Sequence, residues 1–179
     1  MTVTSDYAIV GRIIESLRRF GSWCGETHIQ KGGYLAKAVF GVPLSVDFVL
    51  YKHGPYSFDL TSLLTSMRAD QLIKLVPQGQ HYGPSFDLDD RIQSIMERYQ
   101  NEIGRVELEI DKVAAFLGPK NVADLERVAT AIYVWEKDRT ASQEAKAEEL
   151  HRLKPHISML GAIAAVNEAD LFLRDSGII

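Results

Sequence analysis

The residues that most resemble a catalytic pair are Cys24 and His28, which lie four positions apart and could act as a thiol nucleophile and its base. A lone cysteine beside Trp23, just before a helical segment, is more often a small packing residue. The chain also has no glycine-rich phosphate loop, Cys-x-x-Cys pair, His-Glu-x-x-His motif or Gly-x-Ser-x-Gly elbow. We therefore expect Cys24 to be buried and inert, and we expect no enzymatic activity.

A metal site would have to be built from histidines in separate segments. His28, His53 and His81 could in principle converge with Asp47 or Asp59, but no two of these residues have the spacing typical of a metal motif. Scattered histidines and aspartates of this kind are more often solvated or structural than metal ligands. We expect no metal and no cofactor.

Two segments combine local irregularity with an aromatic residue, as binding surfaces often do. Two adjacent glycines inside a predicted helix each cost about 1 kcal/mol relative to alanine, and a Gly-Pro turn fixes where the following tyrosine points. We predict that they form one protein-binding surface: Gly32, Gly33, Tyr34, Lys52, His53, Gly54, Pro55 and Tyr56. The alternatives are that the glycines allow close helix packing and that the tyrosines only pack the turn onto the helix.

The elements that carry these residues follow from hydrophobic periodicity and from breaker residues. Thr27 and Gln30 have the spacing of a helix capping box, and Ser57 is a plausible cap for the next helix. The predicted order is a helix over residues 6–20, a helix over 27–40, a strand over 46–52, a turn over 53–56, a helix over 58–68, a strand over 72–76, a turn over 78–80 and a returning strand over 81–86.

The rest of the chain has helical periodicity, with breaks at Gly118-Pro119 and Pro155. We expect helices over residues 87–103 and 106–117, one after Asn121, one opened by Thr140 and Gln143, and one capped by Ser158. The fold class is therefore mainly α with some β. A winged-helix-like part with a small antiparallel sheet would occupy residues 1–86. A helical bundle over residues 87–179 would pack on it, in two domains or in one.

Composition and charge limit the choice of partner. With 179 residues, of which 46% are hydrophobic and 25% charged, the chain has the size of one ordinary globular domain or of a small domain with an appendage. One cysteine indicates a reducing compartment, and neither a signal peptide nor an apolar run of about 20 residues is present, so we expect a cytoplasmic protein without a membrane span. The net charge of −4 disfavours strong binding to nucleic acid.

Several stretches together resemble two bacterial families, the Panacea (SocA-like antitoxin) domain and, more closely, the uncharacterised YwgA-like proteins. A helix with a Tyr-Leu-Ala type sequence precedes a glycine, and an extended segment then leads to a Gly-Pro turn that opens the next helix. The stretches are residues 30–37 (Gln-Lys-Gly-Gly-Tyr-Leu-Ala-Lys) with Gly41, Phe48 with residues 51–57 (Tyr-Lys-His-Gly-Pro-Tyr-Ser), residues 125–130 and residues 153–158.

This resemblance implies a non-enzymatic protein that binds another protein, such as a toxin or a component of a phage-defence or mobile-element locus. The alternative is a winged-helix regulator that binds nucleic acid. The candidate recognition helix over residues 58–68 exposes Asp59 and only one cation, Arg68, so direct DNA binding should be weak. Because phosphate contacts release counterions, the affinity of such a regulator would fall steeply as salt rises, whereas that of a protein-binding module need not.

Overall fold

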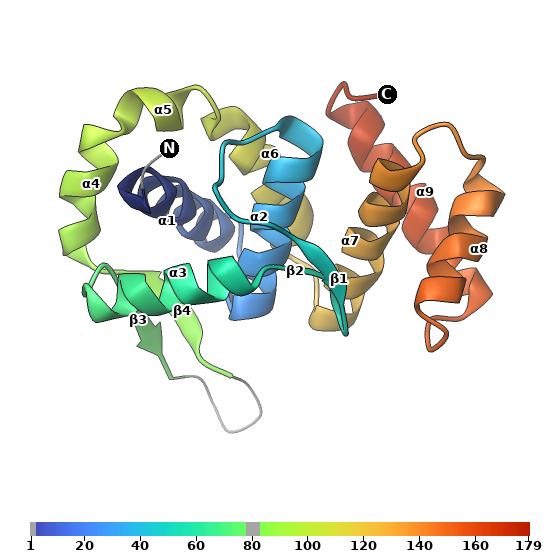
Figure 1. Cartoon of the computed structure of the whole chain (residues 1–179), viewed down its shortest axis with the longest axis horizontal. Helices are drawn as coiled ribbons and strands as arrows, with labels where there is room; N and C mark the ends of the chain where they lie inside the picture. Colours follow the sequence, from blue (N-terminus) through green and yellow to red (C-terminus); the bar gives the residue numbers. More distant parts are fainter. Residues whose placement is uncertain (1–2, 78–82) are drawn as a thin grey trace.

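Most of the chain is helical, and its strands pair into short antiparallel hairpins (Figure 1). The computed structural model describes residues 3–77 and 83–179. In chain order the elements are α1 (Val3–Arg19), α2 (Glu26–Phe40), β1 (Val49–Tyr51), β2 (Gly54–Tyr56), α3 (Phe58–Ala69), β3 (Ile73–Val76), β4 (Ser85–Leu88), the 3-10 turn η1 (Asp90–Ile92), α4 (Gln93–Arg98), α5 (Gln100–Gly104), α6 (Glu107–Leu117), α7 (Val122–Lys137), α8 (Gln143–Leu153) and α9 (Met159–Asp175). The predicted mainly α fold with a small amount of antiparallel β structure is confirmed.

The two hairpins are separate in the part of the chain that the structure describes. Strand β1 pairs with β2, with Leu50 opposite Pro55, and β3 pairs with β4, with Leu75 opposite Phe86. No strand joins the two pairs among the described residues. The winged-helix arrangement, with one small sheet under three helices, is therefore not confirmed.

The helices form two packed groups that share α7 (Figure 1). Helix α6 packs against both α1 and α2, while α4 and α5 cover another side of α1. Helix α7 packs against α2 on one side and against α8 and α9 on the other. One continuous cluster of buried apolar side chains includes members from α1 through α9. Residues 87–179 therefore pack on residues 1–86 through a shared core.

Local capping signals explain where several helices begin. The side chain of Ser57 accepts a hydrogen bond from the Leu60 amide at 3.1 Å. Asn121 and Ser158 cap α7 and α9 in the same manner. Each of these caps satisfies a backbone donor that would otherwise have no partner in the first turn.

Other predicted boundaries are wrong. Helix α2 begins at Glu26 behind Gly25, which has no side chain to cap it, and the Thr27–Gln30 capping box does not form because the Gln30 side chain binds elsewhere. The helix expected over residues 87–103 is interrupted near Tyr99. Strand β1 is shorter than expected, and Gly54–Tyr56 belongs to β2 rather than to a turn. The turn expected over 78–80 and the start of its returning strand at His81 lie outside the described residues.

Candidate functional site

The predicted surface divides into a buried part and an exposed part. A Cβ atom on Gly32 would lie 3.2 Å from Ile13 of α1, and one on Gly33 would lie 3.2 Å from Leu60 of α3. Both glycines are buried in α2, where they let the neighbouring helices approach closely. Because both glycines are buried, the structure gives no support to their place on the predicted protein-binding surface, and the alternative of close helix packing describes them.

Tyr34 is also an interior residue. Its side chain is 3% exposed, its ring meets Phe48 edge-on at 5.4 Å, and its hydroxyl donates a hydrogen bond to Glu136 Oε2 at 2.7 Å. Burial, together with the nearby Glu136 carboxylate, raises the pKa of Tyr34. This hydrogen bond therefore links α2 to α7, and the buried side chain of Tyr34 is not accessible to a partner protein.

The second predicted segment forms the hairpin β1–β2 and is partly exposed. Lys52 and His53 make the tight turn and are exposed, Tyr56 is half-buried, and Gly54 and Pro55 are buried. Gly54 has a φ of 85°, which glycine adopts without strain. The structure thus separates this hairpin from the buried glycine pair.

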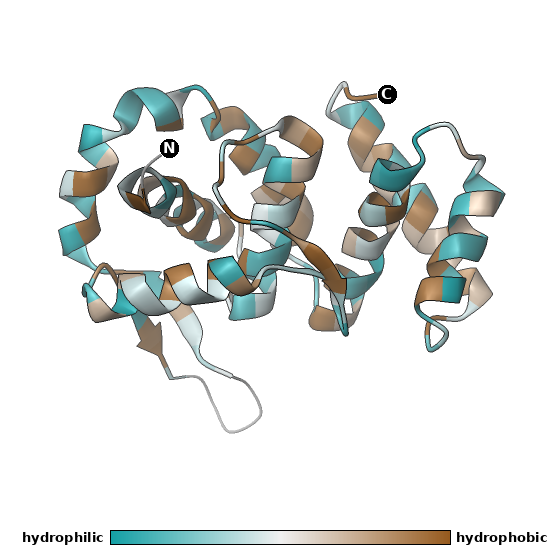
Figure 2. Ribbon diagram, in the orientation of Figure 1, coloured by the Kyte–Doolittle hydropathy of each residue, from teal (hydrophilic) through white to brown (hydrophobic). Residues whose placement is uncertain are grey.

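Exposed aromatic side chains cover the outer face of the hairpin and the start of α3. The rings of Tyr51, Tyr56 and Phe58 contact one another with centroids 5.1 to 5.8 Å apart. Val49, Tyr51 and Phe58 are 49%, 47% and 57% exposed. Figure 2 shows the hydrophobic character of β1 at this place. We call Val49, Tyr51, Tyr56 and Phe58 the aromatic patch.

Hydrogen bonds to α2 fix one side of the aromatic patch. The Tyr56 hydroxyl lies 2.6 Å from Thr61 Oγ1 and donates to Glu26 Oε1 at 3.3 Å. The Gln30 amide group bonds the Ser57 backbone twice, accepting from its N–H at 2.8 Å and donating to its C=O at 2.9 Å. These bonds set the direction in which α3 leaves the hairpin.

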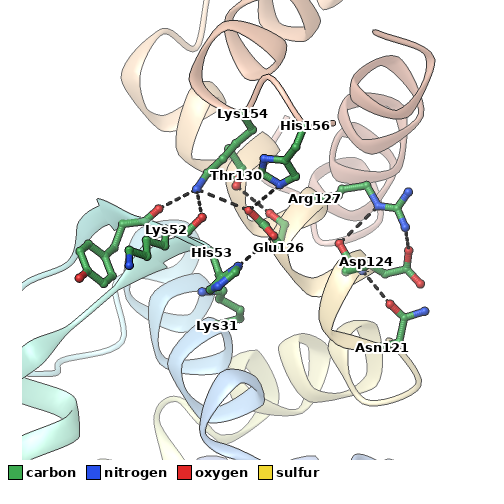
Figure 3. Close-up of polar contacts among 12 residues, drawn as sticks. Lys31, Lys52, His53, Asn121, Asp124, Glu126, Arg127, Thr130, Lys154 and His156 are labelled. Atoms are coloured by element: carbon green, nitrogen blue, oxygen red, sulfur yellow. Dashed lines mark hydrogen bonds and ion pairs between the residues drawn. The ribbon is translucent and has the colours of Figure 1, made fainter. Parts of the chain in front are cut away.

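Two buried lysines donate hydrogen bonds to backbone carbonyls of the hairpin, and Figure 3 shows those of Lys154. Lys31 of α2 donates to the Pro55 carbonyl at 2.8 Å. Lys154, at the end of α8, donates to the Tyr51 carbonyl at 2.6 Å and also to the Lys52 carbonyl. Both lysine residues are almost fully buried, at 2% and 5% exposure. The hairpin is thereby anchored to both helical groups.

A single buried carboxylate, Glu126 of α7, faces these lysines. Its Oε1 atom lies 3.5 Å from Lys154 Nζ and 3.2 Å from His156 Nε2, and its Oε2 atom lies 3.4 Å from His53 Nδ1. Figure 3 shows these groups meeting at Glu126 from different elements. The Lys154 contact to Oε1 is an ion pair, and Oε1 accepts no hydrogen bond from the described residues. Burial lowers the pKa of Lys31 to about 8, with Glu126 opposing that effect and Lys154 adding to it.

A pocket of about 280 Å³ lies between the first turns of α2 and the hairpin. Its walls combine aromatic rings with charged and amide groups. The lining residues are Glu26, Thr27, Gln30, Lys31, Tyr51, Lys52, His53, Gly54 and Tyr56. Four of the predicted site residues therefore line one concave site beside the aromatic patch.

Cys24 and His28, the residues first considered for catalysis, are both buried in the protein interior. Cys24 is buried, as predicted, and burial raises the pKa of its thiol to about 12. His28 is buried with its Nε2 atom 3.0 Å from the Lys120 carbonyl, and burial lowers its pKa. Across residues 3–77 and 83–179, no three side chains of the His, Cys, Asp or Glu types form a group suited to a metal ion. His81 lies outside those residues.

The buried charged residues Lys31, Glu126 and Lys154 were not found from the sequence. Lys31 lies in a stretch, His28 to Ala36, in which every residue is buried, but that burial is a feature of the folded chain and is not visible in the sequence. Glu126 and Lys154 are distant in sequence and carry no local signal of burial either.

Neither a protein-family model nor a curated protein matches the chain. In the described part of the chain, no helix is both long and apolar enough to cross a membrane.

Proposed function

We propose that this protein is a non-enzymatic protein-binding module of the bacterial antitoxin or adaptor type, which serves a toxin–antitoxin, phage-defence or mobile-element locus. The resemblance to the YwgA-like and Panacea families supports the type of module. The aromatic patch is the surface at which we expect the partner to bind.

The observation that carries this proposal is an exposed group of aromatic side chains on the rigidly held hairpin β1–β2 and on the first residue of α3. Phe58 and Tyr51 are about half exposed although both are large and apolar. Clusters of aromatic side chains on a surface are typical of the energetic centre of protein interfaces. The hydrogen bonds from Lys31 and Lys154 fix the hairpin in advance, so little conformational entropy is lost when a partner binds.

Around α3, the helix that would read DNA in a winged-helix regulator, charge and hydrogen bonding favour a protein partner over a nucleic acid. The side chain of Asp47 is 97% exposed, and Asp59 is exposed on the first turn of α3. Both carboxylates would repel phosphates. On the outer face of α3, the hydroxyls of Ser62 and Thr65 donate to carbonyls of their own helix, which reduces their value for reading base edges.

The test is affinity capture from cells that naturally express the protein, with Phe58→Ser compared with wild type. Leu171→Ser is the matched control, because Leu171 on α9 is 58% exposed and Phe58 is 57% exposed. The proposal predicts that Phe58→Ser loses a stoichiometric protein partner and that Leu171→Ser retains it.

The same preparations distinguish the alternative function. A winged-helix regulator would shift duplex DNA in gels, with an affinity that falls steeply as salt rises. Sequence-specific DNA binding at physiological salt that Phe58→Ser leaves unchanged, with no protein captured by wild type, would replace our proposal with that alternative.

A further inference from the structure

The buried charges beneath the hairpin β1–β2 do not balance. Lys31 and Lys154 are buried cations, and Glu126 is the one carboxylate that acts on both of them among the described residues. The other titratable groups that face Glu126 are His53 and His156, which are neutral or positive. One positive charge is therefore left without a counter-charge, and an unbalanced buried ion costs free energy.

The pocket beside the aromatic patch adjoins this excess charge. Buried Lys31 and exposed Lys52 both line it. Its one lining carboxylate is Glu26, whose Oε1 atom already accepts hydrogen bonds from Thr61 Oγ1 at 2.7 Å and from the Tyr56 hydroxyl at 3.3 Å. No ion pair joins Glu26 to either lysine in the described ranges. An anionic group that entered the pocket would thus meet two cations with no carboxylate partner of their own at ion-pair distance.

We propose that this pocket binds a carboxylate side chain of the protein partner, an aspartate or glutamate next to the apolar residue that packs on the aromatic patch; the inference rests on the proposed function. The volume suits one side chain, since sites for drug-sized ligands occupy about 300 to 1,000 Å³. The carboxylate supplies the negative charge that the buried group Lys31, Lys154 and Glu126 lacks, and Tyr51 and Tyr56 flank its aliphatic part.

The lining residues favour a carboxylate over a phosphate group. Proteins often bind phosphate through the two-pronged hydrogen bonds of arginine. No arginine lines this pocket, and its cations are lysines. Glu26 would also repel a doubly charged phosphate more strongly than a singly charged carboxylate.

Nuclear magnetic resonance of the isolated protein tests this directly. The probes are N-acetyl-glutamate amide, the isosteric N-acetyl-glutamine amide and inorganic phosphate. We expect the glutamate compound to shift the backbone amide signals of Lys52, His53 and Gly54, with an affinity about tenfold higher than that of the glutamine compound. It should also raise the pKa of Lys31, because a tenfold preference for the protonated amine moves that pKa up by about one unit.

Variants show whether the pocket is responsible. Lys52→Met removes an exposed cation, so it leaves the fold intact, and it should weaken glutamate binding several-fold. Lys37→Met is the control, because Lys37 lies on α2 with Lys31 but donates to the Val46 carbonyl at 2.6 Å, outside the pocket. Equal binding of the glutamate and glutamine compounds, an unmoved Lys31 pKa, or tighter binding of phosphate would each overturn the inference. If any of these occurs while Phe58→Ser still abolishes capture of the partner, the carboxylate pocket is refuted and the proposed function stands.

Discussion

Replacing Lys31 with methionine should change how the free energy of unfolding depends on pH. The pKa of Lys31 falls from 10.5 in the unfolded chain to about 8 in the folded protein, chiefly because the amine is buried. Each pKa unit corresponds to about 1.4 kcal/mol, so the charged form of this lysine destabilises the fold by about 3 kcal/mol relative to the neutral form. The residue is 2% exposed, so solvent screening reduces this figure little.

The direction of this pH dependence follows from which state, folded or unfolded, loses the Lys31 proton first. Below about pH 8 both states hold the proton and the full penalty applies. As the pH rises from about 8 towards 10.5, the folded state deprotonates first, so the unfolding free energy of wild type increases relative to that of Lys31→Met. At neutral pH the variant is relieved of the charge but loses the hydrogen bond to Pro55, which is worth about 1.5 to 3 kcal/mol for a charged donor. The two proteins should then be nearly equal in stability.

Urea unfolding at a series of pH values measures the effect. We expect wild type to exceed Lys31→Met by about 3 kcal/mol near the upper end of the range. Titration of Cys24 and of the tyrosines cancels in this difference because both proteins contain them. A difference between wild type and Lys31→Met that stays constant over the whole range would refute the account of Lys31 as a buried, destabilised cation.

Three further predictions concern Gly54, Gln30 and Cys24. Gly54→Ala should lower the unfolding free energy by about 2 kcal/mol in urea unfolding, because φ is 85° and the new Cβ would lie 3.0 Å from Thr130 Oγ1; wild-type stability would contradict this. Gln30→Leu should cost about 1 to 3 kcal/mol in the same assay, since it leaves the buried N–H of Ser57 without an acceptor while the Ser57 C=O keeps the Thr61 amide as a donor, and a change below about 0.5 kcal/mol would count against that role. Cys24 should resist a disulfide reagent in the native protein and react on unfolding, as absorbance would show; rapid native reaction would mean that the thiol is accessible.

Signals that depend on near neighbours in the sequence predicted much of the fold. Ser57, Asn121 and Ser158 cap helices as their positions suggest, because a cap bonds an amide two or three residues away. Gln30 shows where such signals fail. Its spacing from Thr27 fits a capping box, but the Ser57 backbone, brought close by the fold, binds the Gln30 side chain instead.

The candidate site was predictable only in part. The Gly-Pro sequence and Tyr56 indicated a turn over residues 53–56, because their conformational restrictions are visible in the sequence. The pairing of Gly54–Tyr56 with β1 was not predicted. Phe58 was predicted only as the first residue of a helix, and its exposure depends on the hairpin that packs beside it. The ion pair between Glu126 and Lys154 joins residues 28 positions apart, and nothing in either local sequence requires it. Burial of charge is a property of the assembled core, so hydrophobic periodicity did not predict it.

The most direct test of the central claim, that the aromatic patch is the surface that binds a protein partner, is the binding isotherm of the purified captured partner. It would be measured by calorimetry with wild type, Phe58→Ser and Leu171→Ser at two salt concentrations. Loss of an aromatic residue at the centre of an interface costs about 2 kcal/mol, so Phe58→Ser should raise Kd by about 30-fold. Leu171→Ser should leave Kd unchanged. A Kd that Leu171→Ser raises and Phe58→Ser does not would contradict the claim.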